Sequence, residues 1–219
     1  MQQRSTHRKF SFEFELKFFV FIQNYFNEKQ RLGTDLNEQE ILRIFTDICR
    51  AVSACHFRRP QPVLHRDIKL ENIIVDARQC YILCDFGSAI FLSQSSTSGD
   101  FEQCEMHRMT TAEIQQVEGD IQRYTTLAYR APEMIDLYSR IPITLKADIW
   151  AMGCLLYRLM YNALPFGESI LAIQNATFCI PDNLCDRYSE NLKRLLRFIL
   201  ENDVKKRPDI WQVRFSFDE

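Results

Sequence analysis

The chain begins with alternating apolar and polar residues and then changes to the spacing of helices. From Phe10 to Lys17 every second residue is apolar, which is the period of a half-buried β-strand. Asn37 and Glu40 have the spacing of a capping box, in which two residues satisfy the first free N–H groups of a helix. Apolar residues then recur every three or four positions up to His56, so we predict an amphipathic helix packed on a core.

A hairpin and two further helices are predicted along the rest of the chain. The β-branched runs Ile73–Val75 and Tyr81–Leu83 are separated by a polar turn, which is typical of a β-hairpin. The segment Ser93–Gly119 is polar and acidic, and we predict a long mobile loop there. Apolar spacing predicts helices over Ile149–Tyr161 and Ser189–Glu201.

Composition narrows the class of protein. The chain is 46% apolar and 26% charged, as in one soluble globular domain, and a net charge of −2 gives no general attraction to nucleic acid. The eight cysteines form no C-x-x-C pair, so we do not expect a zinc site. We expect the cysteines to be reduced, as they are in a cytoplasmic protein. Charged residues interrupt the Phe-rich N-terminal stretch, so we expect neither a transmembrane segment nor a secretory signal.

The segment from His65 to Asn72 carries the clearest chemical signal, because it resembles the catalytic loop of protein kinases. In phosphoryl transfer an aspartate orients the attacking hydroxyl, and Asp67 fits that role. Lys69 can neutralise charge on the transferred group, and the amide oxygen of Asn72 can ligate Mg²⁺. Lysine at position 69 is the pattern of serine/threonine kinases.

A second motif, Asp85-Phe86-Gly87, follows the predicted hairpin. A hairpin returns its two ends to one place, so Asn72 and Asp85 are expected to meet and to share the Mg²⁺ ions that bridge the phosphates of ATP. Ile74, inside the hairpin, is a candidate for packing under the adenine ring, and an ordinary strand core residue is the alternative. Cys84 either lines the nucleotide site or is a buried, inert thiol.

The segment Thr125–Glu133 resembles the end of a kinase activation segment. This resemblance implies that Thr126 hydrogen-bonds Asp67 and Lys69 and helps to position the substrate hydroxyl. It also implies that Glu133 forms a buried ion pair with Arg207. It further implies that Asp148 hydrogen-bonds the backbone of the catalytic loop and holds it in place.

Arg66 is a further candidate, because its guanidinium could pair with a phosphorylated residue of the acidic segment Ser93–Gly119. The alternative is that this segment is a solvated insertion without regulatory phosphosites. Both interpretations remain open at the level of sequence.

Longer strings resemble one subfamily, the numb-associated kinases, which include the adaptor-associated and cyclin-G-associated kinases. The strings are Tyr124–Tyr138, Lys146–Tyr157 and Leu164–Ser169. The resemblance implies a protein-kinase-like α+β fold, formed by a mainly α-helical large lobe with short β-hairpins. It also implies ATP and Mg²⁺ as cofactors and phosphorylation of serine or threonine on endocytic adaptor subunits, with peripheral association at clathrin-coated membranes through partners.

The small N-terminal lobe of a kinase is largely absent from the pattern, because no G-x-G arrangement precedes the catalytic loop. We therefore expect an atypical N-terminal segment at residues 1–26, with a candidate strand remnant of the small lobe. The large lobe is expected at residues 27–215, with a mobile acidic insertion at 92–120, and a short tail at 216–219. The alternative to an active kinase is a truncated, catalytically inactive interaction module. The intact Asp67, Lys69, Asn72 and Asp85 favour kinase ancestry, whereas the missing small lobe favours inactivity of this chain as written.

Overall fold

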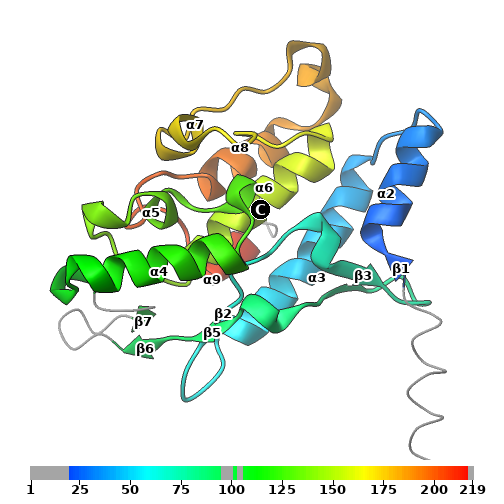
Figure 1. Cartoon of the computed structure of the whole chain (residues 1–219). Helices are drawn as coiled ribbons and strands as arrows, with labels where there is room; N and C mark the ends of the chain where they lie inside the picture. The colour runs from blue at the N-terminus through cyan, green and yellow to red at the C-terminus, as the bar shows by residue number, and fades with distance from the viewer. Residues whose placement is uncertain (1–19, 95–100, 103–105, 217–219) are drawn as a thin grey trace, which may run out of the picture.

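The computed structural model describes residues 20–94, 101–102 and 106–216 (Figure 1). The strand predicted from Phe10 to Lys17 lies outside these residues. Figure 1 shows α2, α3 and a small sheet on one side of the molecule and α4, α5 and α7 on the other, with α6 between them. The mainly helical architecture with small sheets, predicted from the kinase resemblance, is confirmed.

The helices alternate with short irregular connections. They are α2 (Ile22–Arg31), α3 (Glu38–His56), α4 (Thr111–Tyr124), α5 (Pro132–Ile135), α6 (Lys146–Tyr161), α7 (Ile170–Gln174), α8 (Glu190–Ile199) and α9 (Ile210–Phe215). Helix α6 lies at the centre, because it is apolar nearly all round and packs on both α3 and α8. Helix α3 also contacts α9 and the hairpin, so it links the helical core to the strands.

The predicted start of α3 is confirmed. The Asn37 side chain accepts a hydrogen bond from the Glu40 backbone N–H at 2.9 Å, and the Glu40 carboxylate accepts one from the Asn37 N–H at 2.9 Å. This reciprocal pair satisfies two N–H groups that have no partner within the helix. The apolar face of α3 is buried in the core, with Ile41, Ile44 and Phe45 fully inaccessible to solvent.

The predicted hairpin is also confirmed. Its strands β3 (Ile73–Val75) and β4 (Tyr81–Leu83) pair antiparallel, and β1 (Val20–Phe21) adds to the free edge of β3. The turn is closed by Asp76, whose carboxylate accepts hydrogen bonds from the N–H groups of Arg78 and Cys80.

Two further two-stranded sheets lie beside the helices. In the first, β2 (Val63–Leu64) pairs with β5 (Ile90–Phe91). In the second, β6 (Ser93–Gln94) pairs with β7 (Phe101–Glu102). The pairing of β2 with β5 brings the segment before the catalytic loop next to the segment after Asp85-Phe86-Gly87.

A continuous loop is predicted over Ser93–Gly119, within the insertion placed at 92–120. This prediction is wrong from Thr111 onward, where the chain is helical. Helix α4 begins at Thr111, and Thr110 and Glu113 form a capping box like that of α3. Ile114 and Ile121 lie on one face of α4 and are each 1% exposed. Burial of this face and the capped start outweigh the polar composition that predicted a loop.

A buried ion pair joins the end of the activation segment to the C-terminal helices. The Arg207 guanidinium donates to both carboxylate oxygens of Glu133, at 2.8 and 3.0 Å, and both side chains are fully inaccessible. Arg207 also donates to the backbone carbonyls of Lys146 and Glu201. The pair implied by the kinase resemblance is therefore present, and its remaining donors are satisfied.

We expect Arg207→Leu to lower the free energy of unfolding by about 3–5 kcal/mol, because the Glu133 carboxylate would remain buried without its cation. Urea denaturation followed by circular dichroism measures this loss. The control is Arg31→Gln, which breaks an ion pair with Glu28 whose side chains are 74% and 53% exposed, and its effect should stay below about 1 kcal/mol. Equal effects of the two substitutions would contradict the architectural role of the buried pair.

Candidate active site

The catalytic-loop segment is held in place by Asp148 in the first turn of α6. Its carboxylate accepts hydrogen bonds from the backbone N–H groups of His65 and Arg66, at 2.8 and 2.9 Å, and lies 3.0 Å from Nε2 of His56 on α3. Arg66 has a positive φ of 69°, so the loop leaves regular structure at this point. The carboxylate thus supplies the hydrogen bonds that a regular element would have provided.

Three of the predicted site residues meet in direct contact. The Thr126 hydroxyl donates to Oδ1 of Asp67 at 2.7 Å and accepts from Nζ of Lys69 at 2.9 Å. The same Nζ lies 2.7 Å from Oδ2 of Asp67. Asp67 and Lys69 come from the segment between β2 and the short 3₁₀ helix Leu70–Asn72, whereas Thr126 follows α4. The contact implied by the kinase resemblance is therefore present.

Asn72 fixes the other side of the Asp67 carboxylate. Its Nδ2 donates to the backbone carbonyl of Asp67 at 2.8 Å and to Oδ2 of Asp67 at 3.0 Å. This arrangement assigns both amide protons and leaves the amide oxygen as an acceptor. The backbone of Asn72 accepts a hydrogen bond from the Cys84 N–H at 2.9 Å, so the hairpin brings Asp85 to the same end as Asn72.

Asp85 occupies a left-handed backbone conformation with φ 60° and is exposed. Its Oδ1 accepts a hydrogen bond from the Gly87 N–H at 3.2 Å, and a Cβ at position 87 would lie 3.1 Å from that oxygen. Glycine therefore leaves room for the carboxylate. The Phe86 ring packs edge-on against His65 with centroids 4.8 Å apart, although half of Phe86 is exposed.

The donor set of Asn72 and Asp85 fits Mg²⁺, which prefers hard oxygen ligands. Among the residues that the structure describes, no group of three or more His, Cys, Asp or Glu side chains could hold a metal ion by itself. Mg²⁺ commonly uses one or two protein ligands and takes the rest from phosphates and water. The Asn72 amide oxygen and the Asp85 carboxylate would therefore suffice as the protein ligands of Mg²⁺ when nucleotide phosphates are bound beside them.

Ile74 and Cys84 lie next to these residues. Ile74 is half-buried in the middle of β3, opposite Phe21 and Ile82, so it retains an accessible surface. The Cys84 thiol donates to the Asn72 carbonyl at 3.2 Å, and burial together with the charge of Asp85 raises the pKa of this thiol. These features favour an unreactive Cys84.

Asp120 on α4 is a site neighbour that the sequence interpretation missed. Its Oδ2 lies 2.7 Å from Nη1 of Arg66, and the same guanidinium donates through Nε to the Ser88 carbonyl at 2.6 Å. An aspartate of the chain itself thus occupies the position for which a phosphate was considered. The capping box and apolar spacing of α4 could have revealed the helix, but nothing local in the sequence links Asp120 to Arg66.

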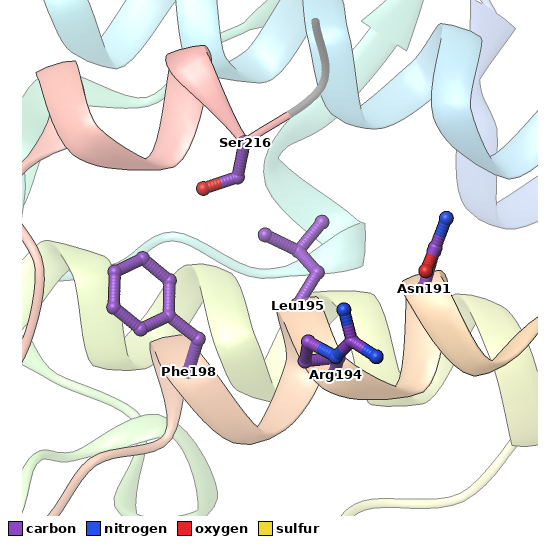
Figure 2. Close-up of a pocket in the computed structure, with 5 residues that line it drawn as sticks. All are labelled: Asn191, Arg194, Leu195, Phe198 and Ser216. Carbon is purple, nitrogen blue, oxygen red and sulfur yellow. The ribbon is translucent and has the colours of Figure 1, made fainter. Parts of the chain in front are cut away.

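A cavity of about 490 Å³ lies away from these residues, between α8 and the end of α9 (Figure 2). Asn191, Arg194, Leu195 and Phe198 line it from α8, and Ser216 faces them (Figure 2). None of the predicted site residues contributes to its lining. This cavity therefore belongs to a different part of the molecule from the candidate active site.

Comparison with known proteins decides the family. The protein kinase domain matches residues 11–215. The chain belongs to the protein kinase family. Relatives of this kinase chain are named as serine/threonine kinases: sel-5 of Caenorhabditis elegans is 41% identical over 189 residues, and ppk30 of Schizosaccharomyces pombe is 42% identical over 186 residues. These alignments cover 85% and 84% of this chain.

A third relative of this kinase chain is actin-regulating kinase 1 of Saccharomyces cerevisiae, which is 40% identical over 184 residues, or 84% of the chain. The chain spans only 16%, 18% and 26% of the lengths of sel-5, ppk30 and actin-regulating kinase 1. Together the domain match and these names identify a protein serine/threonine kinase family member. Within the described residues, no helix has both the length and the apolarity to cross a membrane.

The described cysteine thiols differ in burial, and their reactivity tests the environment of Cys84 beside the candidate site. Burial raises the pKa of Cys55 to about 11 and also raises that of Cys84, whereas Cys80 and Cys179 are exposed. A rise of about two pKa units lowers the thiolate fraction at pH 8 by about 100-fold. We expect iodoacetamide to label Cys80 and Cys179 at least ~10-fold faster than Cys55 and Cys84, as measured by peptide mass spectrometry. Equally fast labelling of Cys84 would show a reactive thiol in the site.

Proposed function

We propose that this chain transfers the γ-phosphate of ATP to serine or threonine hydroxyls of proteins. The observation that supports this function is the contact of Thr126 with both Asp67 and Lys69. It joins the activation segment to the loop that bears the aspartate and the lysine. The Thr126 hydroxyl, the Asp67 carboxylate and the Lys69 ammonium are grouped together, so a substrate hydroxyl beside them could be bound and oriented by hydrogen bonds.

The chemistry follows from the charges at this point. Asp67 accepts a hydrogen bond from the attacking hydroxyl and turns its oxygen toward the phosphorus atom. The cation of Lys69 lies 2.7 Å from that carboxylate. A cation at this place can neutralise charge that develops on the group transferred beside Asp67. Asn72 and Asp85 would hold Mg²⁺, and that ion would supply positive charge beside the phosphates of ATP. Ile74 provides an apolar surface for the adenine ring.

The substrate is a protein, and we propose endocytic adaptor subunits as its class. Support comes from the strings Tyr124–Tyr138 and Lys146–Tyr157, which resemble kinases of the numb-associated group. Under this proposal the kinase acts in the cytoplasm and reaches clathrin-coated membranes through its protein partners. A threonine peptide from an adaptor subunit and a scrambled peptide of the same composition separate this substrate class from general phosphorylation. Equal rates on both peptides would remove the adaptor proposal and leave the kinase activity standing.

Asp67→Asn and Asp85→Asn should each lower phosphate incorporation by at least ~10²-fold, because one removes the group that orients the hydroxyl and the other a ligand of the metal. The measurement uses the purified chain, Mg²⁺, radiolabelled ATP and the adaptor peptide. Asp182→Asn is the matched control, since this aspartate begins the 3₁₀ helix Asp182–Arg187 outside the site. Incorporation by the unsubstituted chain no higher than by Asp85→Asn would refute the proposed activity.

Thr126→Val should lower the turnover number by about 10- to 100-fold, since valine keeps the shape of threonine but loses the hydrogen bonds to Asp67 and Lys69. The dissociation constant of ATP should remain unchanged, because the substitution leaves Asn72 and Asp85 intact. Thr126→Ser retains the hydroxyl and is the control. Phosphate transfer by Thr126→Val at the rate of the serine variant would exclude the hydroxyl from the mechanism.

A further inference from the structure

Three large aromatic side chains gather on the surface where α3 ends and α9 packs against it. Phe57 follows the last residue of α3, and Trp211 and Phe215 lie one turn apart on α9. Trp211 meets the rings of Phe57 and Phe215 edge-on, with centroids 6.0 and 4.7 Å apart. The three side chains are 49%, 50% and 52% exposed in chain order. We call these three residues the aromatic patch.

The core of the protein does not need the aromatic patch. Helix α9 buries Ile210 and Val213, which attach it to the core, and turns Trp211 and Phe215 outward. The outward face of a surface helix is ordinarily polar. Edge-to-face contact shields part of each ring, but half of each side chain stays in water. Contiguous apolar surface of this kind marks a contact site.

Arginine side chains accompany the aromatic patch. The guanidinium carbon of Arg214 lies 6.0 Å from the centroid of the Trp211 ring, and Arg58 and Arg59 directly follow Phe57 in the chain. All three arginines are exposed. Within the described residues, no carboxylate forms an ion pair with any of the three. The surface therefore combines exposed rings with positive charge that the chain does not compensate.

This combination favours an anionic lipid surface as the occupant. Guanidinium groups bind phosphate oxygens, and Trp and Phe side chains are stable at the level between headgroups and acyl chains. A second copy of the chain seated on the same face would bring arginines against arginines. An extended peptide would gain no strand-like pairing from α9, whose backbone groups bond within the helix.

We propose that the aromatic patch, together with Arg58, Arg59 and Arg214, is a docking surface for anionic membranes. The arginines pair with lipid phosphates, and Trp211 enters the interfacial layer. The formal net charge of the chain is −2, so the attraction is local to this face and orients the molecule. The lipid is bound directly, without a protein partner, and this binding does not depend on the proposed kinase function.

Sedimentation of the whole chain with protein-free vesicles measures the electrostatic part. The partition coefficient should be at least ~10-fold higher on phosphatidylcholine vesicles with about 30% phosphatidylserine than on phosphatidylcholine alone, and should fall as salt screens the charges. The double variant Arg58→Gln with Arg59→Gln should lose most of this gain. The matched control is Arg78→Gln with Arg123→Gln, which removes two exposed charges from the hairpin turn and from α4 and should bind as the unsubstituted chain does.

Tryptophan fluorescence tests the insertion of the aromatic patch. The chain has two tryptophans, and Trp150 is fully buried, so a change on binding reports Trp211. Anionic vesicles should shift the emission to shorter wavelength, and bromine atoms on the acyl chains should quench it. Trp211→Phe keeps an aromatic ring but leaves Trp150 as the emitter, and neither effect should then appear.

The outcomes decide the proposal. Equal partition on neutral and anionic vesicles overturns it, and so does equal binding by the two double variants, because the lipid would then lie on another face. Anionic binding without quenching in the unsubstituted chain also overturns it, and this measurement needs no variant that might fail to fold. Binding of fluorescent polyglutamate that the Arg58→Gln, Arg59→Gln variant loses, without binding to vesicles, would assign the surface to an acidic protein partner and overturn the membrane proposal. Absence of phosphate transfer, by contrast, would leave it standing.

Discussion

One buried carboxylate, that of Asp148, holds the site together. It is 1% exposed and is shared by the backbone N–H groups of His65 and Arg66 and by the ring of His56. Because Arg66 has a positive φ, the loop cannot satisfy these N–H groups through a regular helix or strand. Asp67 follows directly on this backbone, so the hydrogen bonds of Asp148 help to place the Asp67 side chain for its contacts with Thr126 and Lys69.

The site is then completed from segments that are far apart in the chain. Thr126 reaches Asp67 across 59 positions, and Asp120 reaches Arg66 across 54. Neither residue would find its partner if α4 were a loop, because the ordering of a free segment costs conformational entropy at each residue. Helix α4, with its buried Ile121, offsets part of that cost.

Local patterns in the sequence predicted the elements that local interactions stabilise. The capping box at Asn37 and the β-branched runs of the hairpin identified α3, β3 and β4, and the kinase-like motif identified Asp67 by its spacing. Helix α4 carried an equivalent capping box at Thr110, but its polar composition favoured a loop. The contact between Asp120 and Arg66 had no local signal at all, since it depends on the packing of α4 in three dimensions.

Two ion pairs show how the fold separates stability from chemistry. Glu133 and Arg207 are fully buried, which suits a pair that only holds elements together, since water and ligands cannot reach it. The Asp67 and Lys69 side chains remain 10% and 22% exposed. Under the proposed function a substrate hydroxyl has to reach Asp67, and this partial exposure leaves the carboxylate accessible from solvent. The same kind of interaction is thus sealed from solvent where it joins elements of the fold and open to solvent at the candidate active site.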